Sequence, residues 1–316
     1  MTIAWVLGSS GLLGAALCRA LRRRGSKLFF PVQRFSWDSA PELSSQITAA
    51  VQSFSAQVRV ADRWEIYWAA GVGTMGSTEE ALAPETRALT LIIKLLEAEP
   101  RLMAAPGAIA FASSAGAIYA GSSDDIITEN TDAEPTTAYA REKLRQEELV
   151  RSFALANDGT TALIARISTL YGLGQATGKQ QGLLSHIARS ILRNKPVQIY
   201  VPYDTIRDYI SADDAAASMV TTLRTTNERP HVLLKIIASE HPVTIAEIVS
   251  IFKRIARRTP RIVTSASKHS TLYSRRVQFR SIAFLECAKT PTKRLPVGIA
   301  QLMSAERAAF VRGRAS

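Results

Sequence analysis

A tyrosine and a lysine four residues apart could together move a proton. A helix would place the Tyr139 phenol and the Lys143 ammonium group on one face. A free phenol, with a pKa of about 10, is a poor base at neutral pH. A neighbouring ammonium group favours the phenolate and lowers that pKa. Tyr139 could then accept a proton from a hydroxyl group or return one to a carbonyl group.

Ser113 and Ser114 follow the short apolar run 108–112, which we expect to be a strand. A serine hydroxyl at such a strand end could donate a hydrogen bond to the oxygen that gains or loses the proton. The two serines therefore join Tyr139 and Lys143 as candidate catalytic residues.

Three glycines are spaced for a loop that binds phosphate. They follow the apolar run 3–7 and open a segment, 12–21, with helical spacing. Glycines at such a turn let the backbone approach a pyrophosphate and let the helix pack closely on the strand. The helix N-terminus then attracts the phosphates. The loop predicts a dinucleotide cofactor bound by Gly8, Ser10, Gly11, Leu12 and Gly14.

The end of the second expected strand, 28–32, favours NADP over NAD. An acidic residue about 20 positions after the glycines usually binds the adenosine ribose of NAD, but no carboxylate occurs here before Asp38. Arg34 could instead pair with the 2′-phosphate of NADP. The expected cofactor is therefore NADP or NAD, with NADP slightly favoured.

Apolar runs alternate with helical patterns over the first 170 residues. We expect strands at 3–7, 28–32, 65–70, 108–112 and 161–167. We expect helices at 12–21, 40–56, 85–98 and 134–156, and less regular helical patterns at 183–193, 212–222 and 245–257. This alternation predicts right-handed crossovers and an α/β fold with a parallel sheet covered on both faces.

The order of these motifs resembles the extended short-chain dehydrogenase/reductases, and within them the NAD-dependent epimerase/dehydratase family. The motifs are the glycine loop, Ala69-Ala70-Gly71, the stretch from Ser113 to Tyr119, the Tyr139/Lys143 pair and Arg207-Asp208-Tyr209-Ile210. The resemblance implies a Rossmann doubly wound parallel sheet over residues 1–170, with a return segment near 205–240. It also implies a smaller C-terminal substrate-binding domain formed by 171–204 and 241–316.

The resemblance also implies roles for single residues. Tyr139 would be the catalytic acid/base, and Lys143 would be its electrostatic partner and a ligand of the cofactor ribose. The spacing from Tyr139 favours Ser114 as the catalytic hydroxyl, with Ser113 in reserve, whereas alignment on the Tyr119 motif places Ala115 there. The cofactor-binding residues would further include Ala69, Ala70 and Gly71.

A nucleotide-linked sugar is the substrate that the resemblance implies. Arg207 matches an arginine that contacts the substrate diphosphate, although a salt bridge to a neighbouring aspartate is the alternative. Gln181, Ser185 and Arg280 are further candidates for substrate contacts. The reaction would be an epimerisation with the cofactor retained, or a reduction of a keto-sugar nucleotide by NADPH. A non-catalytic NAD(P)-binding regulator is the remaining alternative.

Some substitutions limit the transfer from the family. The acid/base pair of dehydratases is replaced by Gly116-Ala117, which argues against 4,6-dehydration. Thr169 stands where many relatives have asparagine, and residues 59–63 lack a clear third strand. The resemblance also implies a homodimer, in which two helices of each subunit pack together, including the helix that carries Tyr139.

Composition and charge limit the function classes that remain possible. The 316 residues have a formal net charge of +12, and residues 251–316 carry 15 basic and only 2 acidic side chains. Such a field attracts anionic ligands, but no helix-turn-helix or aromatic-basic pattern supports nucleic-acid binding. The four histidines are scattered and two cysteines are too few for a disulfide framework. We therefore expect a cytoplasmic protein with no metal site and no membrane segment.

Overall fold

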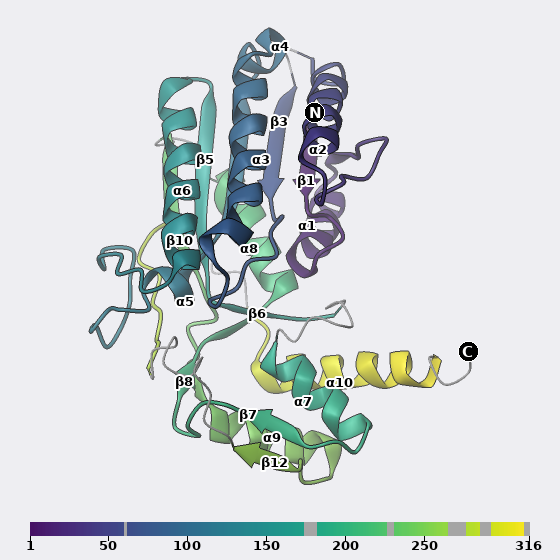
Figure 1. Ribbon diagram of the computed structural model, residues 1–316, viewed down its shortest axis with the longest axis vertical. Helices are drawn as coiled ribbons and strands as arrows, with labels where there is room; N and C mark the ends of the chain where they lie inside the picture. Colours follow the sequence, from purple (N-terminus) through teal and green to yellow (C-terminus); the bar gives the residue numbers. More distant parts are fainter. Residues whose placement is uncertain (60–61, 174–181, 226–230, 265–275, 285–291, 313–316) are drawn as a thin grey trace.

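A six-stranded parallel sheet forms the upper part of the molecule (Figure 1). The computed structural model describes residues 1–59, 62–173, 182–225, 231–264, 276–284 and 292–312. The strand order is β10-β5-β4-β3-β1-β2, and all neighbouring strands are parallel. The strands are β1 (Thr2–Leu7), β2 (Lys27–Phe29), β3 (Arg63–Trp68), β4 (Gly107–Ser114), β5 (Thr160–Ile167) and β10 (Val232–Ile237). The α/β class predicted from the sequence is confirmed.

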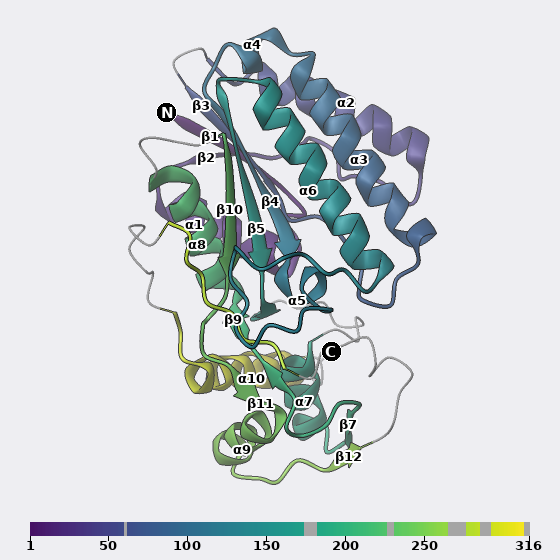
Figure 2. The same cartoon turned by 90° about the vertical axis from the view of Figure 1, so that its left-hand side faces the viewer.

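Helices cover both faces of this sheet (Figure 2). One face carries α1 (Leu12–Arg23) and α8 (Ala212–Thr225), and the other carries α2 (Ala40–Ser55), α3 (Glu79–Glu97) and α6 (Ala138–Ala156). Successive side chains of a strand point to opposite faces, so Trp5 packs in the core under α2 and α3, whereas Ala4 packs in the core under α1. Two short helices, α4 (Pro100–Met103) and α5 (Ala115–Ile118), flank β4.

Among the described residues, the lower part of the molecule contains three two-stranded sheets and three helices. The strand pairs are β6 (Thr169–Tyr171) with β9 (Tyr209–Ser211), β7 (Val197–Ile199) with β12 (Ile262–Thr264), and β8 (Ile206–Arg207) with β11 (Val243–Thr244). The helices α7 (Leu183–Leu192), α9 (Ile245–Ala256) and α10 (Leu295–Arg312) enclose an apolar cluster that includes Ile187, Ile248 and Leu302. This part therefore has its own core.

Three element boundaries differ from the sequence expectation for local reasons. The second strand ends at Phe29, and Val32 is 97% exposed. α3 begins six residues earlier than expected because the Thr78 side chain accepts a hydrogen bond from the Ala81 N–H and caps the helix. Likewise, Thr137 caps α6, which excludes Pro135 from the helix. Helix α10 lies in the charged C-terminal region, where the sequence pattern was too weak to predict it.

The direction of the chain changes at β1. The chain passes from β1 outward to β2, and then crosses to β3 on the other side of β1. The described residues between β2 and β3 form no further strand, although Arg63, in the range 59–63 without a clear strand pattern, begins β3. Ligands of open α/β sheets bind outside the carboxyl ends of the strands at such a switch point. The loops that follow β1, β3 and β4 therefore frame the candidate site.

Candidate active site

The turn after β1 requires its glycines. Gly8 has a φ of +79°, and a Cβ atom there would lie 2.5 Å from the Ala69 carbonyl oxygen. A Cβ atom on Gly14 would lie 2.0 Å from the Gly8 carbonyl oxygen. No side chain larger than hydrogen fits at either position without a backbone shift. The loop therefore brings β1, α1 and the end of β3 unusually close together.

The N-terminus of α1 is open to an anion. Gly11 is the N-cap residue and provides no side-chain cap, and the first helical turn contains no acidic residue. Ser10 and Gly11 are exposed. Free backbone N–H groups and the positive end of the helix dipole bind phosphate. This donor set and the tight glycine turn fit the pyrophosphate of a dinucleotide.

The loop after β3 lies next to the glycine turn. The Ala69 N–H donates to the Leu7 carbonyl oxygen at 3.0 Å, and Ala70 is buried behind it. Gly71 has a φ of +145°, and a Cβ atom there would lie 2.6 Å from a carboxylate oxygen of Glu85. The three residues predicted from the resemblance therefore lie at the switch point, and Gly71 leaves space for an acidic side chain.

Tyr139 lies in the first turn of α6 and is half-buried. Its ring packs on Gly73, where a Cβ atom would lie 3.1 Å from two ring carbons. The Lys143 Nζ atom lies 5.8 Å from the centre of this ring and 5.1 Å from that of Phe111. The Tyr139 hydroxyl forms no hydrogen bond with any residue of the described ranges. The phenol and the ammonium group thus adjoin, as their spacing predicts.

Lys143 is buried and has two polar partners that we did not predict from the sequence. Its Nζ donates to Glu85 Oε1 at 2.7 Å and to Gln146 Oε1 at 3.0 Å. Burial lowers the pKa of Lys143, but the Glu85 carboxylate and Tyr139 raise it, and the net result lies above the ordinary value. The sequence held one signal for Glu85, which occupies a position on the apolar stripe of α3. A carboxylate there indicates a buried partner.

The two candidate serines have different environments. Ser113 is buried, and its hydroxyl donates to Glu147 Oε1 at 2.5 Å. Arg166 pairs with the same carboxylate at 2.7 Å and donates to the Tyr119 hydroxyl at 2.6 Å. Ser113 thus belongs to a buried network. Ser114 is half-buried, and its hydroxyl has no hydrogen-bond partner among the residues that the structure describes.

Arg34 lies in the loop after β2, and its side chain is exposed. The loop itself is fixed, because the Ser36 N–H donates to Gln46 Oε1 at 2.7 Å and Gln46 Nε2 donates back to Ser36 Oγ at 3.1 Å. Within the described ranges, the guanidinium group makes no ion pair. It is therefore free to meet a phosphate beside the end of β2.

Two of the substrate candidates, Arg207 and Ser185, lie in the lower part of the molecule. Arg207 on β8 is half-buried and donates to the Ile206 carbonyl oxygen at 2.7 Å. Arg280 is exposed on a segment that pairs with β8 through Arg276. Ser185 is buried on α7. Gln181 lies outside the described residues.

The aspartates next to Arg207 have other partners. Asp208 accepts the Ser168 hydroxyl at 2.6 Å and the Ser239 N–H at 2.9 Å. Asp213 pairs with Arg19 at 2.6 Å. Asp208 and Asp213, the neighbouring aspartates that could form a salt bridge with Arg207, thus each have another partner.

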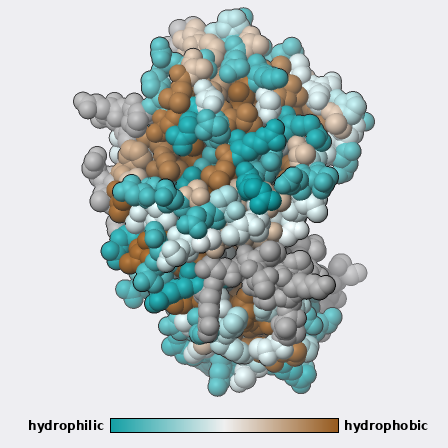
Figure 3. Space-filling view, turned by 60° about the vertical axis from the view of Figure 1, so that its left-hand side comes forward, coloured by the Kyte–Doolittle hydropathy of each residue, from teal (hydrophilic) through white to brown (hydrophobic). Residues whose placement is uncertain are grey.

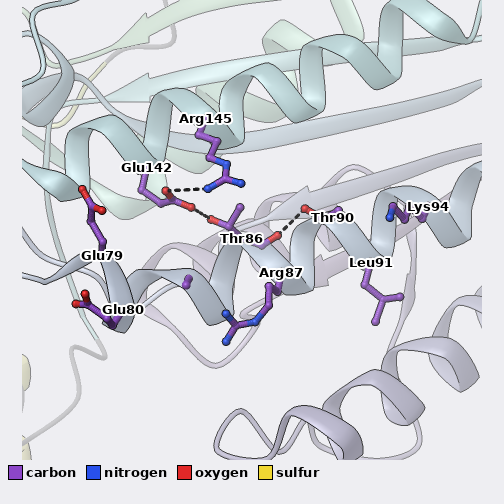
Figure 4. Close-up of a pocket in the computed structure, with 10 residues that line it drawn as sticks. Glu79, Glu80, Thr86, Arg87, Thr90, Leu91, Lys94, Glu142 and Arg145 are labelled. Atoms are coloured by element: carbon purple, nitrogen blue, oxygen red, sulfur yellow. Dashed lines mark hydrogen bonds and ion pairs between the residues drawn. The ribbon is translucent and has the colours of Figure 1, made fainter.

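A groove of about 660 Å³ runs between α3 and α6 (Figure 4). Charged side chains line it, including Glu79, Arg87, Lys94 and Arg145. Hydrophilic and apolar residues are interspersed over the upper part of the surface (Figure 3).

Among the described residues, no three histidine, cysteine or acidic side chains are grouped to hold a metal ion. No helix in the described ranges is long and apolar enough to cross a membrane.

Residues 4–234 match the sequence model of the NAD dependent epimerase/dehydratase family. The chain belongs to this family. A dTDP-L-rhamnose 4-epimerase of Burkholderia thailandensis is 33% identical over 96 residues, which cover 30% of this chain and 26% of that protein. A dTDP-4-dehydro-6-deoxyglucose reductase of Escherichia coli is 31% identical over 115 residues, which cover 36% of each protein. The alignments thus span about a third or less of these curated relatives.

Solved structures of other proteins share the family fold. The UDP-glucose 4-epimerase of Thermus thermophilus in complex with NAD superposes with a TM-score of 0.79 at 15% identity. The superposition covers 98% of this chain and all of that one. The Rossmann-type fold predicted from the glycine loop and the alternating elements is therefore confirmed.

Proposed function

We propose that this protein is an NAD(P)-dependent oxidoreductase or epimerase that acts on a nucleotide-linked sugar. The observation that carries the proposal is the contact between Lys143 and the Tyr139 ring at the switch point of the sheet, with a Tyr139 hydroxyl that has no hydrogen-bond partner among the described residues. Family membership and two relatives named as dTDP-sugar enzymes support the substrate class.

Different residues of the site would have different roles in hydride transfer. The backbone of Gly8, Gly11 and Leu12 would hold the pyrophosphate of the cofactor, which accepts or supplies the hydride. Lys143 would hold the ribose hydroxyls. The hydroxyl of Tyr139 would take the proton from the sugar hydroxyl as hydride leaves, or return it when a carbonyl group is reduced.

The remaining site residues would orient the substrate. Ser114 would hydrogen-bond the reacting oxygen, since Ser113 is already bound to Glu147. Arg207 would bind the diphosphate. We propose NADP as the preferred cofactor because Arg34 is exposed, and forms no ion pair with a described residue, where the adenosine ribose binds in this fold.

A ketoreductase that uses NADPH on a keto-sugar nucleotide is the second candidate. The reductase relative and Arg34 favour it, whereas the epimerase relative favours retention of the cofactor. Absorbance at 340 nm distinguishes the two reactions, because net reduction consumes the reduced cofactor and epimerisation does not. A non-catalytic NAD(P)-binding regulator would bind the cofactor without turnover.

The test is a panel of dTDP- and UDP-sugars incubated with each cofactor, with the protein and its Tyr139→Phe variant compared. We expect a loss of at least about 100-fold in turnover for the variant, with cofactor affinity changed little. Unchanged turnover in the variant would exclude Tyr139 as the acid/base.

We also propose a homodimer through α3 and α6, and substrate binding by residues 171–204 and 241–316. Sedimentation and substrate titration test these two points.

A further inference from the structure

Glu85 is a buried acidic residue without a part in the function proposed above. Its side chain is 9% exposed and lies on α3, between the Leu82 and Leu89 positions of the apolar stripe. One carboxylate oxygen accepts from Lys143 at 2.7 Å, and the other faces the space left by Gly71. Glu85 therefore lies within the candidate active site, although it is remote from Lys143 in the sequence.

The second partner of Lys143 fixes the same arrangement. Gln146 accepts from Lys143 through its oxygen, and its nitrogen donates to the Thr86 hydroxyl at 2.8 Å. Thr86 in turn donates to Glu142 at the groove between α3 and α6 (Figure 4). Both groups that face the lysine are thus acceptors. Two acceptors suit a charged ammonium group and restrict the rotation of the Lys143 side chain.

We propose that Glu85 is a positioning residue that orients Lys143 and offsets its charge beside the place where the nicotinamide ring of the cofactor would lie. This inference rests on the proposed function and deepens it by giving Glu85 a part in cofactor binding.

The physical reason is that an ion pair has a weaker field than a single charge. An unbalanced ammonium group repels a second cation that binds close to it. A carboxylate 2.7 Å from the ammonium group reduces this repulsion, because the two charges oppose each other.

No other carboxylate of the described residues forms an ion pair with Lys143. Lys143 is faced by Glu85 from α3, by Tyr139 and Glu147 from α6, and by the uncharged ring of Phe111 from β4. Glu147 is held by Arg166. Glu85 is therefore the carboxylate that directly pairs with Lys143.

The test compares the Glu85→Gln variant with two controls. Glu85→Asp keeps the charge on a shorter side chain, and Glu97→Gln removes a charge from an exposed position on the same helix. Folding of each variant is checked by circular dichroism and thermal melting. The first readout is the pH profile of carbonyl reduction on the best sugar nucleotide of the panel. The second is the ratio of the affinities for the oxidised and reduced dinucleotides, measured by fluorescence titration without substrate.

In Glu85→Gln, we expect the alkaline limb of the reduction profile to move down by about one pH unit, because the Glu85 carboxylate raises the pKa of Lys143 and its removal lowers that pKa. We also expect a several-fold loss of affinity for the oxidised dinucleotide relative to the reduced one, because an unbalanced Lys143 repels the cationic nicotinamide ring. Glu85→Asp should retain most of the wild-type behaviour and Glu97→Gln all of it.

Two results would overturn the inference alone. One is an active wild-type protein whose Glu85→Gln variant matches it in both readouts, and the other is an equal shift in Glu97→Gln. A wild-type protein that neither binds a dinucleotide nor transfers hydride would refute the proposed function, and this inference with it.

Discussion

Replacement of Lys143 by methionine should destabilise the fold as well as impair the chemistry. The substitution keeps most of the apolar stem but removes the ammonium group that pairs with Glu85. Both side chains are less than a tenth exposed, so the Glu85 carboxylate would remain buried without a counter-ion. Loss of one partner of a buried ion pair costs about 3–5 kcal/mol. Since domains are stable by only about 5–15 kcal/mol, this is a large share of the total.

A double-mutant cycle measures this dependence. Glu85→Gln alone should cost less than Lys143→Met, because the glutamine amide oxygen can still accept from the ammonium group. The double variant replaces the pair by uncharged groups and should recover much of the stability, with a coupling energy of about 2 kcal/mol or more. Lys94→Met, at an exposed position of α3, is the control and should lie within about 0.5 kcal/mol of the wild type.

The assay is urea unfolding followed by tryptophan fluorescence, since Trp5, Trp64 and Trp68 are buried in the sheet. Additive effects of the two single substitutions would show that Glu85 does not depend on Lys143. A cost below about 1 kcal/mol for Lys143→Met would show the same. Either result would refute the reasoning from the buried ion pair. If the expected loss is found, the activity of Lys143 variants must be corrected for the folded fraction.

Four further outcomes follow from the described contacts. The folded-state pKa of Lys143 is raised, so the stability that Lys143 contributes is complete below its unfolded pKa of about 10.4 and is lost as the pH rises through its folded pKa. Urea unfolding between about pH 9 and pH 12 should therefore show a steeper loss of stability for the wild type than for the double variant. Gly14→Ala should abolish dinucleotide binding in fluorescence titrations, because its Cβ atom would overlap the Gly8 carbonyl oxygen; retained wild-type affinity would contradict this. Ser113→Ala should lower the melting temperature, whereas Ser114→Ala should lower turnover at unchanged stability, and the reverse pattern would exchange their roles. Arg34→Ala should weaken NADPH binding about tenfold without affecting NADH, and equal losses for both would argue against a 2′-phosphate contact.

The strands were predictable because their signal is local. β1, β3 and β5 are short apolar runs, bounded by turn residues, and each lies within about two residues of its expected range. The glycine loop was predictable for the same reason, since its three glycines belong to one turn. Helix α10 was not predictable, because charged residues interrupt its apolar face and its packing partners α7 and α9 are distant in the sequence.

The partners of the site residues depend on contacts between distant segments. Glu85 meets Lys143 across 58 positions, and Glu147 meets Ser113 across 34. No spacing rule connects residues on different helices and strands, so the sequence could place Tyr139 beside Lys143 but could not predict that the lysine has a counter-ion. Only the position of a carboxylate on an apolar stripe indicated that such a partner exists.

The chain passes between the upper sheet and the lower sheets more than once, and this limits how the protein can be divided. It leaves the sheet after β5, returns through β9 and α8, and leaves again after β10. A truncated protein ending at residue 170 would leave the edge of β5 unpaired, and it would strip Ala215, Met219 and Leu223 from the apolar face beside α1. Such a fragment would expose both an unpaired strand edge, which can pair with another chain, and an apolar surface. A fragment of residues 1–170 should therefore aggregate, whereas a split protein that keeps residues 205–240 together with residues 1–170 retains all six strands of the sheet.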